Sequence, residues 1–116
     1  MSSVREDSIA NGTADIIVAT YTINVTRNEK VSFAGPYCPE AEVVPFGQYS
    51  DCLEVRGEQF TDGPYGIGLA KDDTDFRTFI NDVLEKIFED GRWAEAWEAT
   101  AGTVLPTPEP PALDRS

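Results

Sequence analysis

The segment "DIIVATYTINVTRNEKVSFAGPY" (residues 15–37) contains the strand signal on which the fold of this chain depends. Its apolar start runs without a break from Ile16 to Ala19 and carries the β-branched residues typical of strands. A continuous apolar run of this kind predicts a strand that is covered on both faces, as in a parallel or mixed sheet. We therefore begin from an α/β architecture.

Shorter elements follow and precede this strand. "NVTRNEKV" (24–31) predicts a turn or a single helical turn, and "SFAGPY" (32–37) closes the unit with its Gly-Pro pair as a breaker. Upstream, "VREDSIANG" (4–12) reads as a short helix, and Gly12 supplies its left-handed C-cap. Downstream, "YGIGLA" (65–70) predicts another strand, with glycines where a second backbone comes close.

The clearest helix signal is "DTDFRTFINDVLEKIFEDG" (73–91), in which acidic residues and a threonine cap the start and Gly91 ends the helix. Its apolar residues follow the i, i+3, i+4, i+7 spacing of an amphipathic helix, and they are Phe76, Phe79, Ile80, Val83, Leu84, Ile87 and Phe88. We expect a helix over residues 75–90 that packs on the strands around 15–20 and 65–70.

Three further segments complete the prediction. "RWAEAWEATAG" (92–102) predicts a second helix with Trp93 and Trp97 on one face. The middle of the chain predicts a short strand at 43–44 and a short helix at 47–55. The last fourteen residues contain four prolines, which predicts a disordered or polyproline-like tail.

Composition narrows the classes of function. The chain has 116 residues, which suits one modest domain, and its net charge of −12 leaves no basic face for nucleic acid or anionic lipid. It lacks histidine, so a Ser-His-Asp arrangement is impossible, and we expect no enzyme, metal or cofactor. We see no segment of about 20 apolar residues that could span a bilayer. We also see no signal peptide, so the chain as written is expected in the cytoplasm.

The two cysteines, Cys38 and Cys52, leave two alternatives open. A disulfide between them would close a loop of about 15 residues, for which chain entropy gives roughly 3 kcal/mol of stability. A pair of small buried thiols is an equal alternative from sequence alone. Zinc is disfavoured, because without histidine only carboxylates could supplement the two sulfurs.

A candidate binding set follows the apolar run. Thr20 and Thr22 are two residues apart, so on a strand both hydroxyls face the same side. Arg27 follows, and its guanidinium can clamp a carboxylate through two parallel hydrogen bonds. The simpler interpretation, which spacing alone favours, is two ordinary strand threonines and a solvated surface charge.

The order of these segments resembles family 3 extracellular solute-binding proteins, the polar amino-acid receptors of ABC importers. "ADIIVATYTINVTRNEKVSFAGPY" resembles the signature segment of that family, in which a strand leads through spaced hydroxyl residues and an arginine to an aromatic-rich turn. "FTDGPYGIGLAKDDTDFRTFINDVLEKIFEDGRWAEAWEATAG" looks like the C-terminal part of the family, and "PEAEVVPFGQYSDCLEV" resembles a piece of the second lobe. The nearest likeness is to glutamate or glutamine receptors.

The resemblance implies a type II periplasmic-binding-protein fold reduced to a small mixed sheet flanked by helices. It implies a partial solute-binding domain over residues 1–102. Within that domain we expect a first-lobe segment at 4–37, a second-lobe remnant at 39–56 and a C-terminal segment at 58–102. The tail then covers 103–116.

The resemblance also implies a function. Thr20 and Thr22 would hydrogen-bond the α-carboxylate of glutamate, aspartate or glutamine, and Arg27 would form its salt bridge. The partner would be an ABC transporter permease, and the location would be extracellular or periplasmic. Cys38 and Cys52 resemble a bridge that joins two parts of the second lobe in some relatives.

The chain departs from the family pattern at two internal positions. The anion-binding loop and the acid that holds the ligand's α-amino group have no counterpart in the sequence. We therefore expect weak or no binding, since these receptors bind by closing two lobes on the ligand. The alternative is a fragment of the same fold that binds no amino acid and self-associates.

Overall fold

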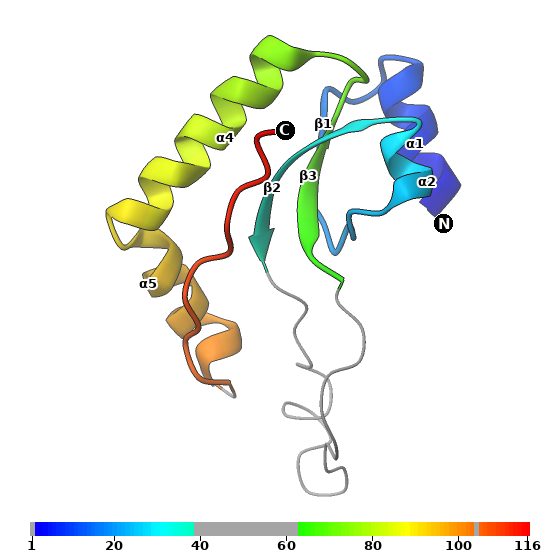
Figure 1. Ribbon diagram of the computed structural model, residues 1–116. Helices are drawn as coiled ribbons and strands as arrows, with labels where there is room; N and C mark the ends of the chain where they lie inside the picture. Colours follow the sequence, from blue (N-terminus) through cyan, green and yellow to red (C-terminus); the bar gives the residue numbers. More distant parts are fainter. Residues whose placement is uncertain (1, 39–62, 104) are drawn as a thin grey trace, which may run out of the picture.

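The computed structural model describes residues 2–38, 63–103 and 105–116 (Figure 1). Helices and strands occupy the first two of these ranges. In chain order they are α1 (Ser2–Ala10), β1 (Ile16–Ile17), α2 (Val25–Asn28), β2 (Ser32–Cys38), β3 (Tyr65–Leu69), α4 (Thr74–Glu89), α5 (Arg92–Ala99) and the 3-10 helix η1 (Ala101–Thr103). The strand and helix expected within 42–55 lie outside the described residues.

Three strands form one small sheet in the order β1-β3-β2, and helices flank it. The α/β architecture is therefore confirmed. Both pairings in the described residues are antiparallel, whereas the sequence suggested a mixed sheet. Leu69 pairs with Ile16 on one side and with Ser32 on the other, so β3 is central.

The apolar run after Asp15 is not covered on both faces as expected. β1 comprises Ile16 and Ile17 alone, Ile16 is 40% exposed, and Val18 is 62% exposed. The chain bends at residues 19–20 and leaves the sheet. An apolar run shows that a segment favours a strand, but it does not show whether that strand will be central or at an edge.

Two apolar clusters lie on opposite faces of the sheet. Phe33 and Ala34 are adjacent in β2 and belong to different clusters, because successive side chains of a strand point to opposite faces. The first cluster consists of Ile9, Tyr21, Val31 and Phe33, and the second of Ala34, Ile67, Leu69 and Leu84. α4 thus covers the side chains of β3, as predicted, and it also packs on β2, which the sequence did not predict. β1 packs against α1 instead of α4.

The glycines of β3 make room for side chains of the first cluster. A Cβ on Gly66 would lie 2.7 Å from Ile23 Cγ1, and one on Gly68 would lie 2.8 Å from Tyr21 Cε1. The sequence predicted a close approach at these glycines, and the atoms that approach are side chains where we expected a backbone. On one face of β3, apolar side chains therefore contact α4. On the other face, its two glycines leave room for the first apolar cluster.

The helix predictions hold closely. Asp73 caps α4 by accepting a hydrogen bond from Phe76 N at 3.2 Å, and Gly91 adopts a φ of 87° between α4 and α5. Trp93 and Trp97 are both buried, and their rings stack with 5.4 Å between centroids. Among the described helices, none is long and apolar enough to cross a membrane.

Two segments differ from expectation. β2 continues through Gly35-Pro36 to Cys38, with an irregular register after Ala34, because a proline is tolerated on an edge strand where its missing N–H breaks no ladder bond. Residues 105–116 form no helix or strand, but they lie against the domain. Trp97 Nε1 donates to Pro106 O at 3.1 Å, and Leu113 packs on the second apolar cluster.

Candidate functional site

The threonines of the predicted carboxylate site lie where the chain returns to the sheet after β1. Thr22 forms an isolated antiparallel bridge with Tyr65, the first residue of β3. Two main-chain hydrogen bonds of 2.9 Å support this return, from Gly66 N to Tyr21 O and from Ile23 N to Pro64 O. Because Tyr65 also pairs with Cys38, this is the end of the sheet at which β2 ends and β3 begins.

Arg27 reaches this same end from the short helix α2. Asn24 caps α2 by accepting a hydrogen bond from Arg27 N at 2.9 Å, which fixes the start of the arginine side chain. The guanidinium then turns back, and Nη1 donates to Thr22 O at 2.8 Å. Its carbon lies 4.8 Å from the ring centroid of Tyr21, a cation–π distance. Nη2 makes no hydrogen bond to any described residue, so its donors are available.

A buried carboxylate, Glu6 of α1, completes the surroundings of Arg27. Glu6 Oε1 accepts from Tyr21 Oη at 2.7 Å and lies 3.6 Å from Arg27 Nε. The Glu6 side chain is 8% exposed, and its Oε2 has no hydrogen-bond partner among the described residues. This carboxylate restrains Arg27 at Nε, while Thr22 O binds Nη1.

The electrostatics of the cluster favour a charged Glu6. Burial raises the pKa of Glu6, but the hydrogen bond from Tyr21 and the charges of Arg27 and Lys30 outweigh it, so the pKa is lowered. Burial, followed by the hydrogen bond to Glu6, raises the pKa of Tyr21. Tyr21 therefore remains a neutral hydrogen-bond donor, and Glu6 remains an anion at neutral pH.

Thr20 lies somewhat apart from the other two predicted residues. Its side chain is exposed, and Thr20 O accepts from Arg5 Nη1 at 3.3 Å. Arg5 also lies 5.5 Å from the ring centroid of Tyr21. Within the described residues neither threonine hydroxyl makes a hydrogen bond. The structure thus joins Thr22 to Arg27 through a main-chain oxygen and places Thr20 beside a second arginine.

Sequence reasoning missed Glu6 and Arg5. The available signal was the position of Glu6 three residues before Ile9, because both fall on the buried face of α1. A carboxylate on the apolar face of a helix indicates a polar partner in the interior, since buried charges require one. Nothing in the local sequence identifies Tyr21 or Arg27 as that partner.

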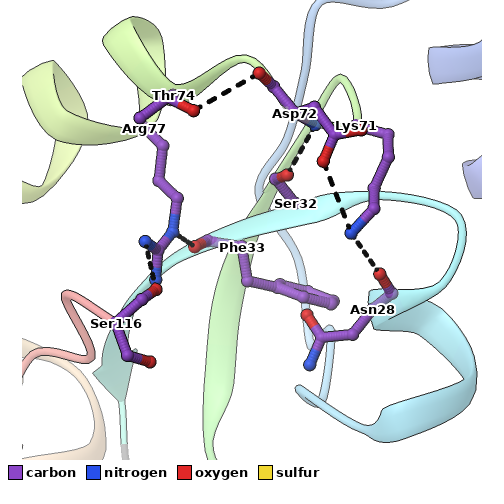
Figure 2. Close-up of polar contacts among 8 residues, drawn as sticks. All are labelled: Asn28, Ser32, Phe33, Lys71, Asp72, Thr74, Arg77 and Ser116. Carbon is purple, nitrogen blue, oxygen red and sulfur yellow. Dashed lines mark hydrogen bonds and ion pairs between the residues drawn. The ribbon is translucent and has the colours of Figure 1, made fainter.

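A cleft of about 570 Å³ opens at the other end of the sheet, between the start of β2, the start of α4 and the tail. Its lining includes the cationic residues Lys71, Arg77 and Arg115 and does not include Thr20, Thr22 or Arg27. Figure 2 shows that two of these cations bind main-chain oxygens. They are Lys71 Nζ with Asn28 O at 2.8 Å and Arg77 Nε with Phe33 O at 2.6 Å.

Neither Cys38 nor a group of metal ligands adds a further site to the arginine cluster or the cleft. Cys38 is half-buried at the end of β2, and burial raises the pKa of its thiol. Cys52 lies outside the described residues, so its pairing with Cys38 remains a prediction. Over the described ranges, no three His, Cys, Asp or Glu side chains come together in a group that could hold a metal.

Sequence comparison identifies the class of protein to which this chain belongs. The model of the bacterial extracellular solute-binding proteins, family 3, matches residues 2–100. This match covers most of the chain, so the chain belongs to that family.

Two curated relatives are more specific. The chain is 26% identical over 167 residues to the glutamate-binding protein GluB of Corynebacterium glutamicum and, at the same identity, to that of Corynebacterium efficiens. Each alignment covers 78% of this chain and 57% of the relative. No solved structure matches the chain significantly. An alignment of 167 residues is longer than this chain of 116, so internal parts of the relatives have no counterpart in it.

Proposed function

We propose that this chain binds the α-carboxylate of a polar amino acid through Arg27, Thr22 and Thr20. The observation that carries the proposal is the orientation of Arg27. Its guanidinium is held at Nε by Glu6 and at Nη1 by Thr22 O, and its Nη2 donors have no described partner. A guanidinium fixed in this way loses little side-chain entropy when it binds a planar carboxylate.

The substrate class follows from the family and from the names of its relatives. The two curated relatives are called glutamate-binding proteins. We therefore propose glutamate, aspartate or glutamine as the ligand and an ABC transporter permease as the partner. The proposed location is the outer side of the bacterial membrane. The role is binding and delivery, with no chemical step.

We expect the affinity to be weak. Arg27 is 22% exposed, and an exposed ion pair contributes about 1 kcal/mol or less. A two-lobe receptor adds contacts from its second lobe when it closes. The contacts proposed for Arg27 involve only the α-carboxylate of a ligand. Millimolar ligand concentrations are therefore appropriate for a test.

The test is a thermal melt of the pure chain with glutamate, glutamine or aspartate, beside the variant Arg27→Ala. A ligand present at ten times its dissociation constant stabilises the folded state by about 1.4 kcal/mol. For a domain of this size that corresponds to a rise in Tm of several degrees. We expect a rise for at least one ligand and none in Arg27→Ala.

Arg92→Ala is the matched control, because Arg92 lies on α5 and pairs with Asp90 at 2.7 Å, away from the cluster. It removes one arginine without touching the proposed site and should keep the ligand response. Equal responses of Arg27→Ala and Arg92→Ala, or no response in the wild type, would contradict the proposal.

The alternative function, an interaction fragment that binds no amino acid, is favoured by exposed apolar side chains. Val18 is 62% exposed and Val25 is 79% exposed, on the two segments that flank Thr20 and Thr22. Isolated exposed apolar residues are ordinary, but two on segments that flank the same loop suit a protein contact. A concentration-dependent dimer in sedimentation analysis, with no ligand response, would favour this alternative.

A further inference from the structure

The last four residues of the chain occupy a groove between β2 and α4. In Figure 1 the red C-terminal trace runs back along α4 and ends beside β2. Leu113 packs on the apolar cluster that includes Ala34, Leu69 and Leu84. This segment is far in sequence from β2, so its position depends on specific contacts and not on chain connectivity.

The groove binds the main chain of this segment. Gly35 O, on the edge of β2, accepts a hydrogen bond from Asp114 N at 2.8 Å. Arg77 of α4 donates from Nη2 to Asp114 O at 2.7 Å and from Nη1 to the main-chain oxygen of Ser116 at 2.9 Å. Its Nε donates to Phe33 O at 2.6 Å, which fixes the guanidinium on the strand. The guanidinium of Arg77 therefore binds main-chain oxygens of two residues, 114 and 116. Oxygens two residues apart point to the same side in an extended peptide.

The groove also contacts two side chains of this segment. Leu113 supplies the apolar contact. Two residues later, Arg115 donates from Nη1 to Asp82 Oδ1 at 2.9 Å and from Nη2 to Glu85 Oε2 at 3.1 Å, and both acids lie on α4. The segment bound is thus an apolar residue, a spacer and an arginine.

We propose that the groove between β2 and α4 is a peptide-binding site whose ligand is an extended apolar-x-Arg segment, supplied by residues 113–116 of the same chain. Arg77 and Gly35 bind the peptide main chain, the apolar cluster takes Leu113, and the acids of α4 take Arg115. The proposal does not depend on amino-acid binding at Arg27, which lies towards the opposite end of the sheet.

Because residues 113–116 are joined to the groove by the chain itself, their bound state sets a limit on the affinity of the groove for the free peptide. A ligand joined to its site by a short linker experiences an effective concentration of roughly millimolar. If the tail is mostly bound in the folded chain, the same peptide added in solution must bind with a dissociation constant of about a millimolar or lower. A synthetic peptide at millimolar concentration must then occupy the empty groove.

The experiment uses the full chain with Leu113→Ala and Arg115→Ala together, which weakens its own tail and leaves the groove unchanged. A synthetic peptide of residues 106–116 is titrated while amide chemical shifts are followed by NMR. We expect saturable shifts centred on Phe33, Gly35 and the part of α4 from Arg77 to Glu85. The matched control is the same peptide with both substitutions, which should shift those amides several-fold less.

Three results would overturn the proposal. The first is no saturable shift at millimolar peptide, and the second is equal binding of the two peptides. The third comes from the unmodified chain, in which residues 113–116 should give heteronuclear NOE values close to those of α4. Values typical of a free tail would show that the groove is empty. This last measurement also decides the matter if the double variant does not fold.

Discussion

At the scale of single residues, Glu6 determines how Arg27 is presented. A carboxylate in the interior is unfavourable unless it is paired and hydrogen-bonded. Glu6 meets that condition through Tyr21 at 2.7 Å and Arg27 at 3.6 Å, and leaves one oxygen without a described partner. The unsatisfied oxygen offsets part of the stability that this pair contributes, while the pair still fixes the orientation of Arg27.

This arrangement predicts an acid-dependent loss of stability that Glu6→Gln reduces. The pKa of Glu6 is lowered in the folded chain, so the unfolded chain binds the proton more tightly. The stabilisation is therefore present above the unfolded pKa of about 4.3, and it is lost as the pH falls through the folded value. Between pH 6 and pH 3, the wild type should lose more free energy of unfolding than Glu6→Gln.

Urea unfolding at the two pH values measures this difference. At pH 6, Glu6→Gln itself should cost about 1 kcal/mol, because a hydrogen bond to a charged acceptor becomes one to a neutral acceptor. Glu95→Gln, at an exposed position of α5, is the control and should follow the wild type at both pH values. If Glu6→Gln and the wild type lost equal stability on acidification, Glu6 would not be the charged partner described above.

At the scale of elements, local patterns predicted the helices well and the sheet less well. A helix was expected over 75–90, and α4 spans Thr74–Glu89, since capping and apolar spacing are local signals. The prediction that β1 is covered on both faces was wrong. Whether a strand lies at an edge depends on partners far away in sequence. The position of the tail was missed for a similar reason: its contacts with Gly35 and Arg77 are long-range.

Among the described residues, β2 is an edge strand, and helices bind its outward main-chain groups. Its alternate residues Phe33, Gly35 and Tyr37 have outward main-chain groups that bind other elements. Phe33 O accepts from Arg77, Gly35 N donates to Asn81 Oδ1 at 2.8 Å, and Tyr37 O accepts from Trp93 at 2.6 Å. α4 and α5 thus satisfy backbone groups that would otherwise be open to another chain.

Asn81 gives this edge a direct test. It is 2% exposed, so Asn81→Ala leaves the buried Gly35 N–H without an acceptor and should lower the free energy of unfolding by about 1–3 kcal/mol. Asn81→Asp keeps an acceptor oxygen for Gly35 N–H but buries a charge, so this control is judged by the protection of Gly35 and not by stability. Hydrogen exchange at Gly35 should accelerate in Asn81→Ala only. An unchanged free energy of unfolding in Asn81→Ala, or equal acceleration of exchange at Gly35 in the two variants, would show that the hydrogen bond contributes little.

At the scale of the whole molecule, the negative net charge opposes the binding of the proposed ligands, and more strongly for ligands that carry more negative charge. The chain carries −12, and its Cα radius of gyration is 15.4 Å. At 0.01 M ionic strength the Debye length is about 30 Å, so a ligand at Arg27 experiences the charge of the entire molecule. At 0.15 M the Debye length is about 8 Å, and the local field of the arginine cluster dominates.

This difference predicts how salt should change selectivity. Glutamate carries one more negative charge than glutamine, and in the proposed site both would present the same α-carboxylate to Arg27. The change of their affinity ratio with salt therefore reports the effect of the global field. As salt rises from 0.01 to 0.15 M, the dissociation constant of glutamate relative to that of glutamine should fall, by about two-fold or more if the repulsion at low salt exceeds about 0.4 kcal/mol. Ligand-titration NMR at the two salt concentrations measures the ratio. A ratio that stays constant or rises would mean that a cation near the ligand's side chain, and not the net charge, controls the choice between the two amino acids.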